Sequence, residues 1–384
     1  MANNNKHTGP NVPALRFPEF SGEWERKALS EFVDRVTRRN KGLKSTRPLT
    51  ISAQFGLVDQ TEFFKKSVAG ADLSNYYLLS KGEFAYNKSY SDGYPLGAIK
   101  RLDRYDSGVL SSLYICFVPK PYMSSDYLVQ YFESTKWNQV VKDISGEGAR
   151  NHGLLNVPVT GFFETQHYIP KRDEQEKLGA FLTLIEKRIA TQSKIIEEQE
   201  TLLKSLADKL FLQNNHSCQL SELVNIVKGK QLNADTLSET GDYYVMNGGI
   251  TPSGYYSEYN VPAGAISISE GGNSCGYVQF NEKPFWSGGH CYSLQCRTNL
   301  VDYKYIYYYL KTKEADVMAL RIGSGLPNIQ KKDIEKFTIS YPSLQLQKQF
   351  VKALDALSGK INTEKNLLEK YCQQKSYLLS QMFI

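Results

Sequence analysis

The feature that most constrains this chain is a stretch from Pro170 to Leu212. Steps of four and three residues alternate along it and define a series of ten positions. Eight of the ten positions in that series are apolar, which is the heptad pattern of a helix that packs along a second helix. Pro170 suits a first helical turn, and the acidic residues that follow it complement the positive end of the helix dipole. The pattern predicts one helix of roughly 60 Å. Its apolar seam consists of Leu178, Leu182, Ile185, Ile189, Ile196, Leu203, Leu206 and Leu210.

A second seam follows near the end of the chain. Moving every position by the interval that leads from Leu178 to Phe350, which we call the repeat interval, gives a series that keeps its phase from Ser343 to Met382. Its apolar or aromatic members are Phe350, Leu354, Leu357, Ile361, Leu368, Tyr371, Leu378 and Met382. The residues before each helix also repeat, since Tyr168-Ile169-Pro170 corresponds to Ser340-Tyr341-Pro342 at the repeat interval. Two unrelated surface helices would have to keep ten positions in one phase by accident. The pattern therefore indicates a tandem duplication, each half a globular unit followed by a long helix.

This organisation divides the chain into four segments. We expect a first globular domain at residues 1–169, a central helix at 170–212, a second globular domain at 213–342 and a C-terminal helix at 343–384. Globular units of about 150 residues are of the usual size for a domain.

Local patterns predict mixed secondary structure in the first domain. We expect a short helix over Gly22 to Val36, strands at Leu49 to Ser52, Phe84 to Asn87 and Leu113 to Val118, and a helix at Asp126 to Phe132. The second domain repeats this order: residues 216–230 match the first short helix, 263–269 match 81–87, 305–310 match 127–132, and 322–329 match 144–152, with Asn328 opposite Asn151. The strands and loops diverge between halves more than the helices do, so one frame is expected to carry two different recognition surfaces.

Several function classes are disfavoured by simple features. The first ten residues lack the apolar segment of a secretory signal, and no run of about 18 apolar residues could span a membrane, so we expect a soluble, cytoplasmic protein. The scattered cysteines have no metal-site spacing and are expected to be free thiols, with His290 packed rather than a metal ligand. These cysteines are Cys116, Cys218, Cys275, Cys291, Cys296 and Cys372.

Two clusters have alternative interpretations. Basic residues crowd between Arg35 and Arg47 in a chain whose net charge is only +6, and such a run marks either a solvated face or a nucleic-acid contact. Tyrosines crowd between Tyr303 and Tyr309, where they could stack on bases. Because these tyrosines cover a whole helical turn and not one face, we expect them in the core and at the junction with the long helices.

The order of the units and several short motifs resemble those of a known family. The order of units, WERKALSEFV at residues 24–33, the loop GSGLPNI at 323–329, and the helix starts EQEKL and QLQKQF are similar to those of specificity (S) subunits of type I restriction-modification enzymes. The resemblance covers nearly the whole chain, although SGEGARNHG at 145–153 departs from the GSGLPNI pattern.

The resemblance implies an α+β fold with an internal pseudo-twofold duplication. Two mixed α/β target-recognition domains would be separated by two long conserved helices that form an antiparallel coiled coil. Each domain would read one half of a bipartite site in double-stranded DNA. The chain would thereby direct adenine methylation, or restriction in bacterial defence, by two modification subunits and two restriction subunits.

The residues supply physical reasons for that role, because Lys and Arg neutralise phosphates while forked or amide side chains read base edges. In the first domain we expect Arg35, Arg38, Arg39, Lys41 and Lys44 at phosphates, and Arg150 and Asn151 at bases. In the second we expect Lys228, Lys230, Arg321 and Lys331 at phosphates, and Asn273, Ser274 and Asn328 at bases. Asn328 could equally form a turn, and Arg321 could be a solvated charge at a helix end.

Catalytic motifs are missing from the sequence. The strings nearest to an amino-methyltransferase motif, Pro119 to Tyr122 and Glu282 to Phe285, lack the acid or amide and the paired prolines, and no phosphate-binding loop or nuclease carboxylate set is recognisable. We therefore expect a non-catalytic chain that binds no cofactor or metal itself, with S-adenosylmethionine, ATP and Mg²⁺ entering through partner subunits.

Two other functions stay open from the sequence. The chain could be a self-contained DNA methyltransferase-nuclease with unrecognised motifs, which binding of S-adenosylmethionine by the isolated chain would support. It could also be a coiled-coil scaffold that does not bind nucleic acid, which indifference to duplex DNA in a partner-containing complex would support.

Overall fold

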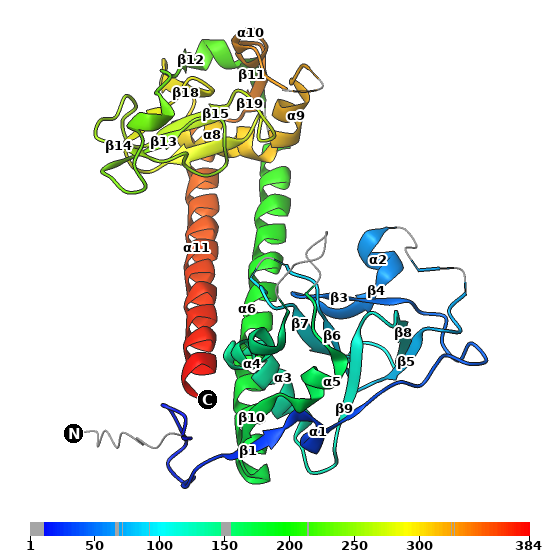
Figure 1. The fold of residues 1–384 in the computed structure, drawn as a ribbon. Coiled ribbons are helices and arrows are strands. Elements are labelled where there is room, and N and C mark those ends of the chain that lie inside the picture. The colour runs from blue at the N-terminus through cyan, green and yellow to red at the C-terminus, as the bar shows by residue number, and fades with distance from the viewer. Residues whose placement is uncertain are drawn as a thin grey trace. The chain divides into compact units, whose positions relative to one another are not determined.

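The computed structural model describes residues 11–65, 69–70, 72–91, 93–146, 155–212, 215–323, 325 and 327–384. The chain forms two compact units: unit 1 comprises Met1–Gln192 with Leu367–Ile384, and unit 2 comprises Ser193–Asn366. Both predicted long helices are present and unbroken, as α6 (Arg172–Phe211) and α11 (Leu344–Gln381) (Figure 1). None of the helices in the described ranges is both long and apolar enough to cross a membrane.

Unit 1 is built around a four-stranded sheet with the order β2-β9-β6-β7, whose neighbours are all antiparallel. Its elements before the long helix are β1 (Glu25–Ala28), α1 (Leu29–Phe32), β2 (Val33–Arg35), β3 (Leu49–Ser52), β4 (Gly56–Asp59), α2 (Gln60–Phe64), β5 (Tyr77–Ser80), β6 (Phe84–Asn87), β7 (Ala98–Arg101), β8 (Ser107–Leu110), β9 (Ile115–Pro119), α3 (Ser125–Glu133), α4 (Lys136–Ile144), α5 (Val159–Glu164) and β10 (Gln166–Ile169). The strands expected near residues 49, 84 and 113 and the helix expected at 126–132 are confirmed.

Unit 2 repeats the same sheet with the order β12-β18-β15-β16. Its elements are β11 (His216–Gln219), α7 (Leu220–Leu223), β12 (Val224–Lys228), the 3₁₀ turn η1 (Ala234–Thr236), β13 (Tyr243–Met246), β14 (Tyr255–Tyr256), β15 (Ala265–Ser269), β16 (Val278–Asn281), β17 (Phe285–Ser287), β18 (Cys291–Cys296), α8 (Tyr303–Thr312), α9 (Glu314–Ala319), α10 (Lys331–Glu335) and β19 (Thr338–Tyr341). The matched pairs β6 with β15 and α3 with α8 agree with the duplication read from the sequence.

The short helix expected over Gly22 to Val36 is wrong, and so is its counterpart in unit 2. The segment is a strand, a single helical turn and a second strand, because β1 pairs with β10 and β2 pairs with β9. Only Leu29 to Phe32 are helical. Pairing with strands that lie much later in the chain therefore overrides the helical spacing of the apolar side chains.

The surroundings of the two sheets differ. In unit 1, the hairpin of β3 with β4 and the pair β5 with β8 form a second small core around Leu79 and Leu110. In unit 2, a three-stranded sheet of order β14-β13-β17 takes that place in the chain, with a small core around Phe285. The duplicated frame thus carries a different subdomain in each half.

The long helices pack against each other within each unit. In unit 1, Leu178 and Leu182 of α6 share a core with Leu378 and Met382 of α11. In unit 2, the end of α6 shares a core with the start of α11 around Leu354, so the two helices run antiparallel in both units. All sixteen apolar seam residues are buried or half-buried, and burial of such side chains is the main force that holds helices together.

One buried glutamine occurs in both halves. Gln175 accepts a hydrogen bond from the backbone N–H of Ser124 (2.9 Å) and donates to the carbonyl of Pro170 (2.9 Å). Gln347, its counterpart at the repeat interval, accepts from the N–H of Asp302 (2.7 Å) and donates to the carbonyl of Pro342 (2.8 Å). Ser124 and Asp302 are the N-caps of α3 and α8. Each glutamine therefore ties the start of a long helix to the cap of the preceding short helix.

The tyrosines of α8 lie where the sequence placed them. Tyr305, Tyr308 and Tyr309 are buried, and the rings of Tyr305 and Tyr309 each lie 5.3 Å from that of Phe211 in α6. The interpretation of these rings as core and helix junction is confirmed. The cysteines are free thiols, as expected.

Candidate nucleic-acid interface

A recess of about 880 Å³ in unit 2, which we call groove 2, gathers polar side chains from the end of β12 and from four loops. Four of the predicted DNA contacts line it, namely Lys228, Asn273, Ser274 and Asn328. The full lining is Lys228, Asn247, Gly248, Gly249, Thr251, Pro252, Ser253, Glu270, Gly271, Gly272, Asn273, Ser274, His290, Pro327 and Asn328. Segments far apart in the sequence thus converge on one surface.

The loop between β15 and β16 presents Asn273 and Ser274. Its ends are joined by a hydrogen bond from the N–H of Ser269 to the carbonyl of Tyr277 (3.0 Å). Gly276 has φ +91°, and a Cβ there would lie 2.7 Å from the Cα of Met318, so only glycine fits. This Gly-rich segment is a structured turn, and it holds two polar side chains at the groove.

The loop that carries Asn328 is fixed by its backbone. Asn328 exchanges two backbone hydrogen bonds with Ile322 (2.8 and 3.0 Å), and the N–H of Ile329 donates to the carbonyl of Glu270 (2.9 Å). The backbone of Asn328 therefore closes a turn, which was the alternative reading, while its exposed side chain lines groove 2.

Glu270 is a groove residue that the sequence reasoning missed. Its Oε1 accepts hydrogen bonds from Lys228 Nζ (2.7 Å) and from the hydroxyl of Tyr292 (2.9 Å). Its Oε2 is buried without a hydrogen-bond partner among the described residues, and His290 Nδ1 lies 3.7 Å from it. The pKa of Tyr292 is raised, mainly because the hydroxyl is buried and also because the Glu270 carboxylate lies beside it. The available signal was an acidic residue directly after a buried strand and before Gly-Gly-Asn.

Groove 2 also corrects one expectation. His290 was expected to be packed, but most of its side chain is exposed, because it stands in the turn between β17 and β18.

The remaining predicted residues of unit 2 lie outside the lining of groove 2. Lys230, Arg321 and Lys331 are all exposed. Arg321 follows Leu320, the C-cap of α9, so its cation lies near the negative end of the helix dipole. Lys331 begins α10 and pairs with Glu335 at 3.6 Å. Their role at phosphates stays a prediction.

In unit 1, part of the basic run is exposed but has partners within the protein. Arg38 pairs with Glu83 and donates to the hydroxyl of Ser80 (2.9 Å). The guanidinium of Arg39 lies 4.6 Å from the ring centre of Tyr77. Arg35, Lys41 and Lys44 are exposed. Arg38 and Arg39 therefore have structural partners that the local sequence did not reveal.

The two base readers predicted for unit 1, Arg150 and Asn151, lie outside the described residues. The loop register, however, can be compared between the units. The N–H of Leu155 donates to the carbonyl of Lys88 (2.9 Å), as that of Ile329 does to Glu270. Ile329 thus corresponds to Leu155. Because Asn151 lies outside the described residues, its expected pairing with Asn328 stays a prediction.

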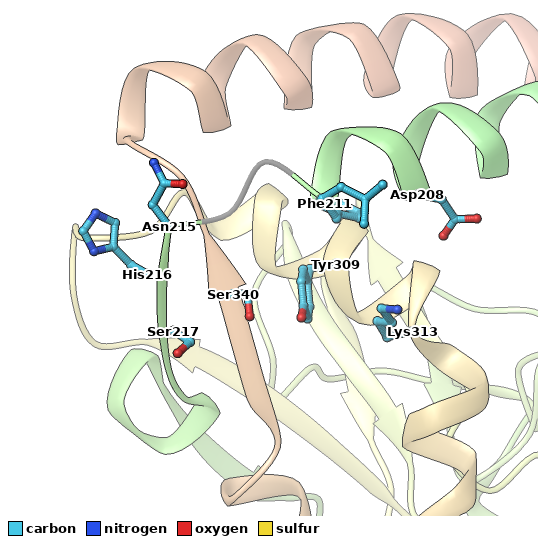
Figure 2. A pocket seen from close by; sticks show the side chains of 9 residues that line it. Asp208, Phe211, Asn215, His216, Ser217, Tyr309, Lys313 and Ser340 are labelled. Atoms are coloured by element: carbon cyan, nitrogen blue, oxygen red, sulfur yellow. The ribbon is translucent and has the colours of Figure 1, made fainter.

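A second recess of unit 2, of about 400 Å³, lies where α6 ends. Figure 2 shows its side chains, which come from α6, β11, β19 and the α8–α9 region: Asp208, Phe211, Leu212, Asn215, His216, Ser217, Tyr309, Lys313 and Ser340. Phe211 and Tyr309 belong to the core of unit 2. None of the predicted DNA contacts lines this recess, so it is a feature of the helix junction.

Comparison with known proteins finds similarity to one family in part of the chain. Residues 214–370 match the family model described as type I restriction modification DNA specificity domain. A putative type I specificity subunit of Mycoplasma pneumoniae is 34% identical over 169 residues, which are 43% of this chain and 45% of that protein. One of Mycoplasma genitalium is 28% identical over 195 residues, 47% of this chain and 49% of that protein. The matching region thus spans about half the length of these relatives.

Solved structures share the fold over nearly the whole chain. The crystal structure of the S subunit of a type I restriction-modification system from M. genitalium has a TM-score of 0.65 at 18% identity and covers 97% of this chain and 99% of that one. A chain from a study of assembly and conformational transition of the type I system has a TM-score of 0.56 at 17% identity, with coverages of 94% and 97%. The resemblance read from the sequence and the mixed α/β fold class with two long helices are confirmed.

Proposed function

We infer that this chain, which carries the DNA specificity domain of type I restriction-modification systems at residues 214–370, is the DNA-recognition subunit of such a complex. The observation that carries this proposal is groove 2, which lies inside the matched domain and gathers predicted DNA contacts from separate loops. Each unit reads one half of a bipartite site in double-stranded DNA and directs adenine methylation or restriction by partner subunits.

The chemistry of groove 2 suits base edges in the major groove. Asn273 and Asn328 offer paired donor and acceptor groups, which fit adenine, and Glu270 offers a carboxylate, which accepts from the amino group of cytosine. Lys228 is held by Glu270 at the groove, so its charge offsets the carboxylate as phosphates approach. We therefore assign base reading to these loops and phosphate neutralisation to the exposed Lys230, Arg321 and Lys331.

The proposal includes partners for the chemistry. Two modification subunits supply methylation with S-adenosylmethionine, and two restriction subunits supply cleavage with ATP and Mg²⁺, all in the cytoplasm. The chain itself is non-catalytic, in keeping with relatives named as specificity subunits and with the absence of methyltransferase and nuclease motifs from the sequence. We keep the division into recognition domains at 1–169 and 213–342 and conserved helices at 170–212 and 343–384 as part of this proposal.

A long-read methylome of cells that carry this chain and its modification partner tests the function directly. The wild type should methylate a split site, and Asn273→Ala or Asn328→Ala should relax one half of it by roughly 5- to 150-fold, since a paired base contact is worth about 1–3 kcal/mol. Asn299→Ala, an exposed amide of unit 2 outside groove 2, should leave the site unchanged. Methyl transfer by the purified chain alone, or an absence of site-specific methylation in the complex, would overturn the proposal.

A further inference from the structure

We propose that unit 1 reads an A·T base pair of its half-site with Gln54, Phe55, Ser89 and Tyr90, a set that we call the hairpin-tip site. The inference rests on the proposed function, and it concerns the sheet of unit 1, which lies outside the residues matched by the family model. None of these four residues belongs to the basic run that the sequence suggested.

The first step is the equivalence of two loops. β6 and β15 are the third strands of sheets with the same strand order. The residue that follows each strand, Lys88 or Glu270, accepts a hydrogen bond from the loop that precedes the last short elements of its unit, through Leu155 or Ile329. The loop after β6 in unit 1 is therefore the structural counterpart of the loop after β15, which presents Asn273 and Ser274 in groove 2.

The second step is the surface around that loop. A recess of about 350 Å³ in unit 1 is lined by Ile51, Ser52, Ala53, Gln54, Phe55, Phe63, Asn87, Ser89, Tyr90, Ser91 and Ala98. It combines the loop after β6 with the tip of the β3–β4 hairpin. Groove 2 combines its equivalent loop with the segment after β13 in the same way. The divergent subdomain thus completes the recess in each unit.

The tip of the hairpin is held by local hydrogen bonds and exposes an aromatic ring. The N–H of Phe55 donates to the hydroxyl of Ser52 (3.1 Å), and Gly56, which pairs with Ser52, has φ +77°. Phe55 nevertheless exposes 57% of its surface and Tyr90 exposes 62%. Large rings held in the open on ordered turns suit contact with a partner, because they lose little entropy on binding.

The described residues of the opposite loop also form hydrogen bonds with one another. The N–H of Ser89 donates to Asn87 Oδ1 (3.1 Å), and Ser91 forms a backbone bridge with Tyr94. Tyr90 therefore lies between two residues, Ser89 and Ser91, whose backbones take part in local contacts. Gln54 and Tyr90 belong to different turns but line one recess, as base-reading side chains from different loops must.

The chemistry of the lining points to an A·T pair. The Gln54 amide has the donor and acceptor that fit adenine, and the rings of Phe55 and Tyr90 suit the thymine methyl group. No Asp or Glu is among the residues that line this recess, whereas Glu270 lines groove 2. The two units are therefore expected to differ in the class of base that they read.

The test uses the complete complex with the modification partner and a methylome as readout. Gln54→Ala and Tyr90→Ala should each relax one A·T position by roughly 5- to 150-fold, in the half-site that Asn273→Ala leaves intact. Gln54→Glu should shift that position toward cytosine, because a carboxylate can only accept hydrogen bonds. Tyr377→Ala, which removes an exposed ring of α11, is the matched control and should leave both halves unchanged.

The outcomes separate this inference from the proposed function. If the wild type methylates a split site and Asn273→Ala relaxes one half, but the Gln54 and Tyr90 variants keep both halves at wild-type stringency, the hairpin-tip site is wrong and the function stands. If the wild type directs no site-specific methylation, the function itself fails. A variant that loses all methylation is checked by co-purification with the modification subunit and by Tyr90→Phe: an assembled but inactive Tyr90→Ala complex with an active Tyr90→Phe complex supports the site, and failure of both to assemble counts against it.

Discussion

The two units use the same sheet and the same buried glutamine, yet they dock their long helices with different chemistry. In unit 1, Arg16 and Glu174 form an ion pair with side chains only 4% and 2% exposed, at 2.7 Å. In unit 2, the counterpart of Glu174 at the repeat interval is Leu346, an apolar residue. The two units therefore share the helix geometry and the buried glutamine, but the ion pair that stabilises the start of α6 has no counterpart at the start of α11.

The source of this difference is a segment that only unit 1 has. Residues 11–24, which we call the N-terminal strap, cover the start of α6: the rings of Phe17 and Phe181 lie 5.5 Å apart, and Trp24 Nε1 donates to Glu174 (3.3 Å). In unit 2, only residues 212–215 separate α6 from β11. A buried carboxylate is tolerable in unit 1 because the strap supplies its partners.

The largest expected effect comes from removing the second globular domain and α11 from the chain. In unit 1, Leu378, Met382 and Phe383 complete the core beside Tyr127. Their counterparts at the repeat interval are Leu206, Leu210 and Phe211. A fragment from Met1 to Gln213 should therefore form a dimer in which each copy supplies the end of α6 to the other, and with the modification subunit it should direct methylation to a palindromic split site.

Light scattering on the purified fragment measures the dimer. Phe211→Asp should give a monomer, because it places a charge in the helix junction, while Lys209→Asp, an exposed position of the same helix, should not. A folded, monomeric wild-type fragment would show that the two helix ends are not interchangeable.

The second prediction sharpens the contrast between the ion pair and the leucine. Arg16→Met leaves the Glu174 carboxylate buried without its cation and should lower the free energy of unfolding of unit 1 by about 3–5 kcal/mol. The double variant Arg16→Met/Glu174→Leu imitates unit 2 and should return to within about 1 kcal/mol of the wild type, since apolar replacements of buried pairs are often neutral. Hydrogen exchange of α3 peptides reports the stability of unit 1.

The control for this variant is an exposed pair on the same helix. Arg172 and Glu176 lie 2.6 Å apart with side chains 43% and 57% exposed, so Arg172→Met should change stability by less than about 1 kcal/mol. Equal losses in the single and double variants would mean that Arg16 acts through the strap and not through the carboxylate.

These contrasts also explain how far the sequence could lead. The long helices were predictable because heptad spacing is a local signal that persists along the whole of each helix, and the match between halves supplied an internal check. The segment around Leu29 was not, because its backbone pairs with strands far along the chain. Short apolar stretches fit a helix or a strand equally well until their partners are known.

The candidate site divides in the same way. Asn273, Ser274 and Asn328 could be proposed from the sequence because they lie in segments where glycine or proline signals a turn. The contact of Arg38 with Glu83 could not be predicted, because Glu83 lies 45 residues away, and the role of Arg38 at phosphates stays a prediction. Glu270, Gln54 and Tyr90 were missed because a site formed by several loops depends on which turns meet, and only the fold decides that.

The smallest predicted effect concerns a titratable group that unit 1 has and unit 2 lacks. His167 is buried, with Nδ1 2.6 Å from the hydroxyl of Tyr131 and Nε2 2.8 Å from that of Thr165. Burial lowers the pKa of His167 from an ordinary value of 6.5 to about 4. Its counterpart at the repeat interval in unit 2 is Ile339, which does not titrate.

The sign of the effect follows from proton binding. Above pH 6.5 the imidazole is neutral in the folded and unfolded states, so its full contribution to stability is present. Between pH 6.5 and 4 only the unfolded state takes up the proton, which costs unit 1 about 1.4 kcal/mol per pH unit, or about 2 kcal/mol at pH 5. Hydrogen exchange at pH 7 and pH 5, corrected for the intrinsic rate, should show this loss in α3 of unit 1 and not in α8 of unit 2. His167→Gln, which keeps a hydrogen-bonding side chain that cannot titrate, should remove the excess loss even if it lowers stability at pH 7, because the slope with pH depends only on the proton; an unchanged slope would assign the acid sensitivity of unit 1 to its carboxylates instead.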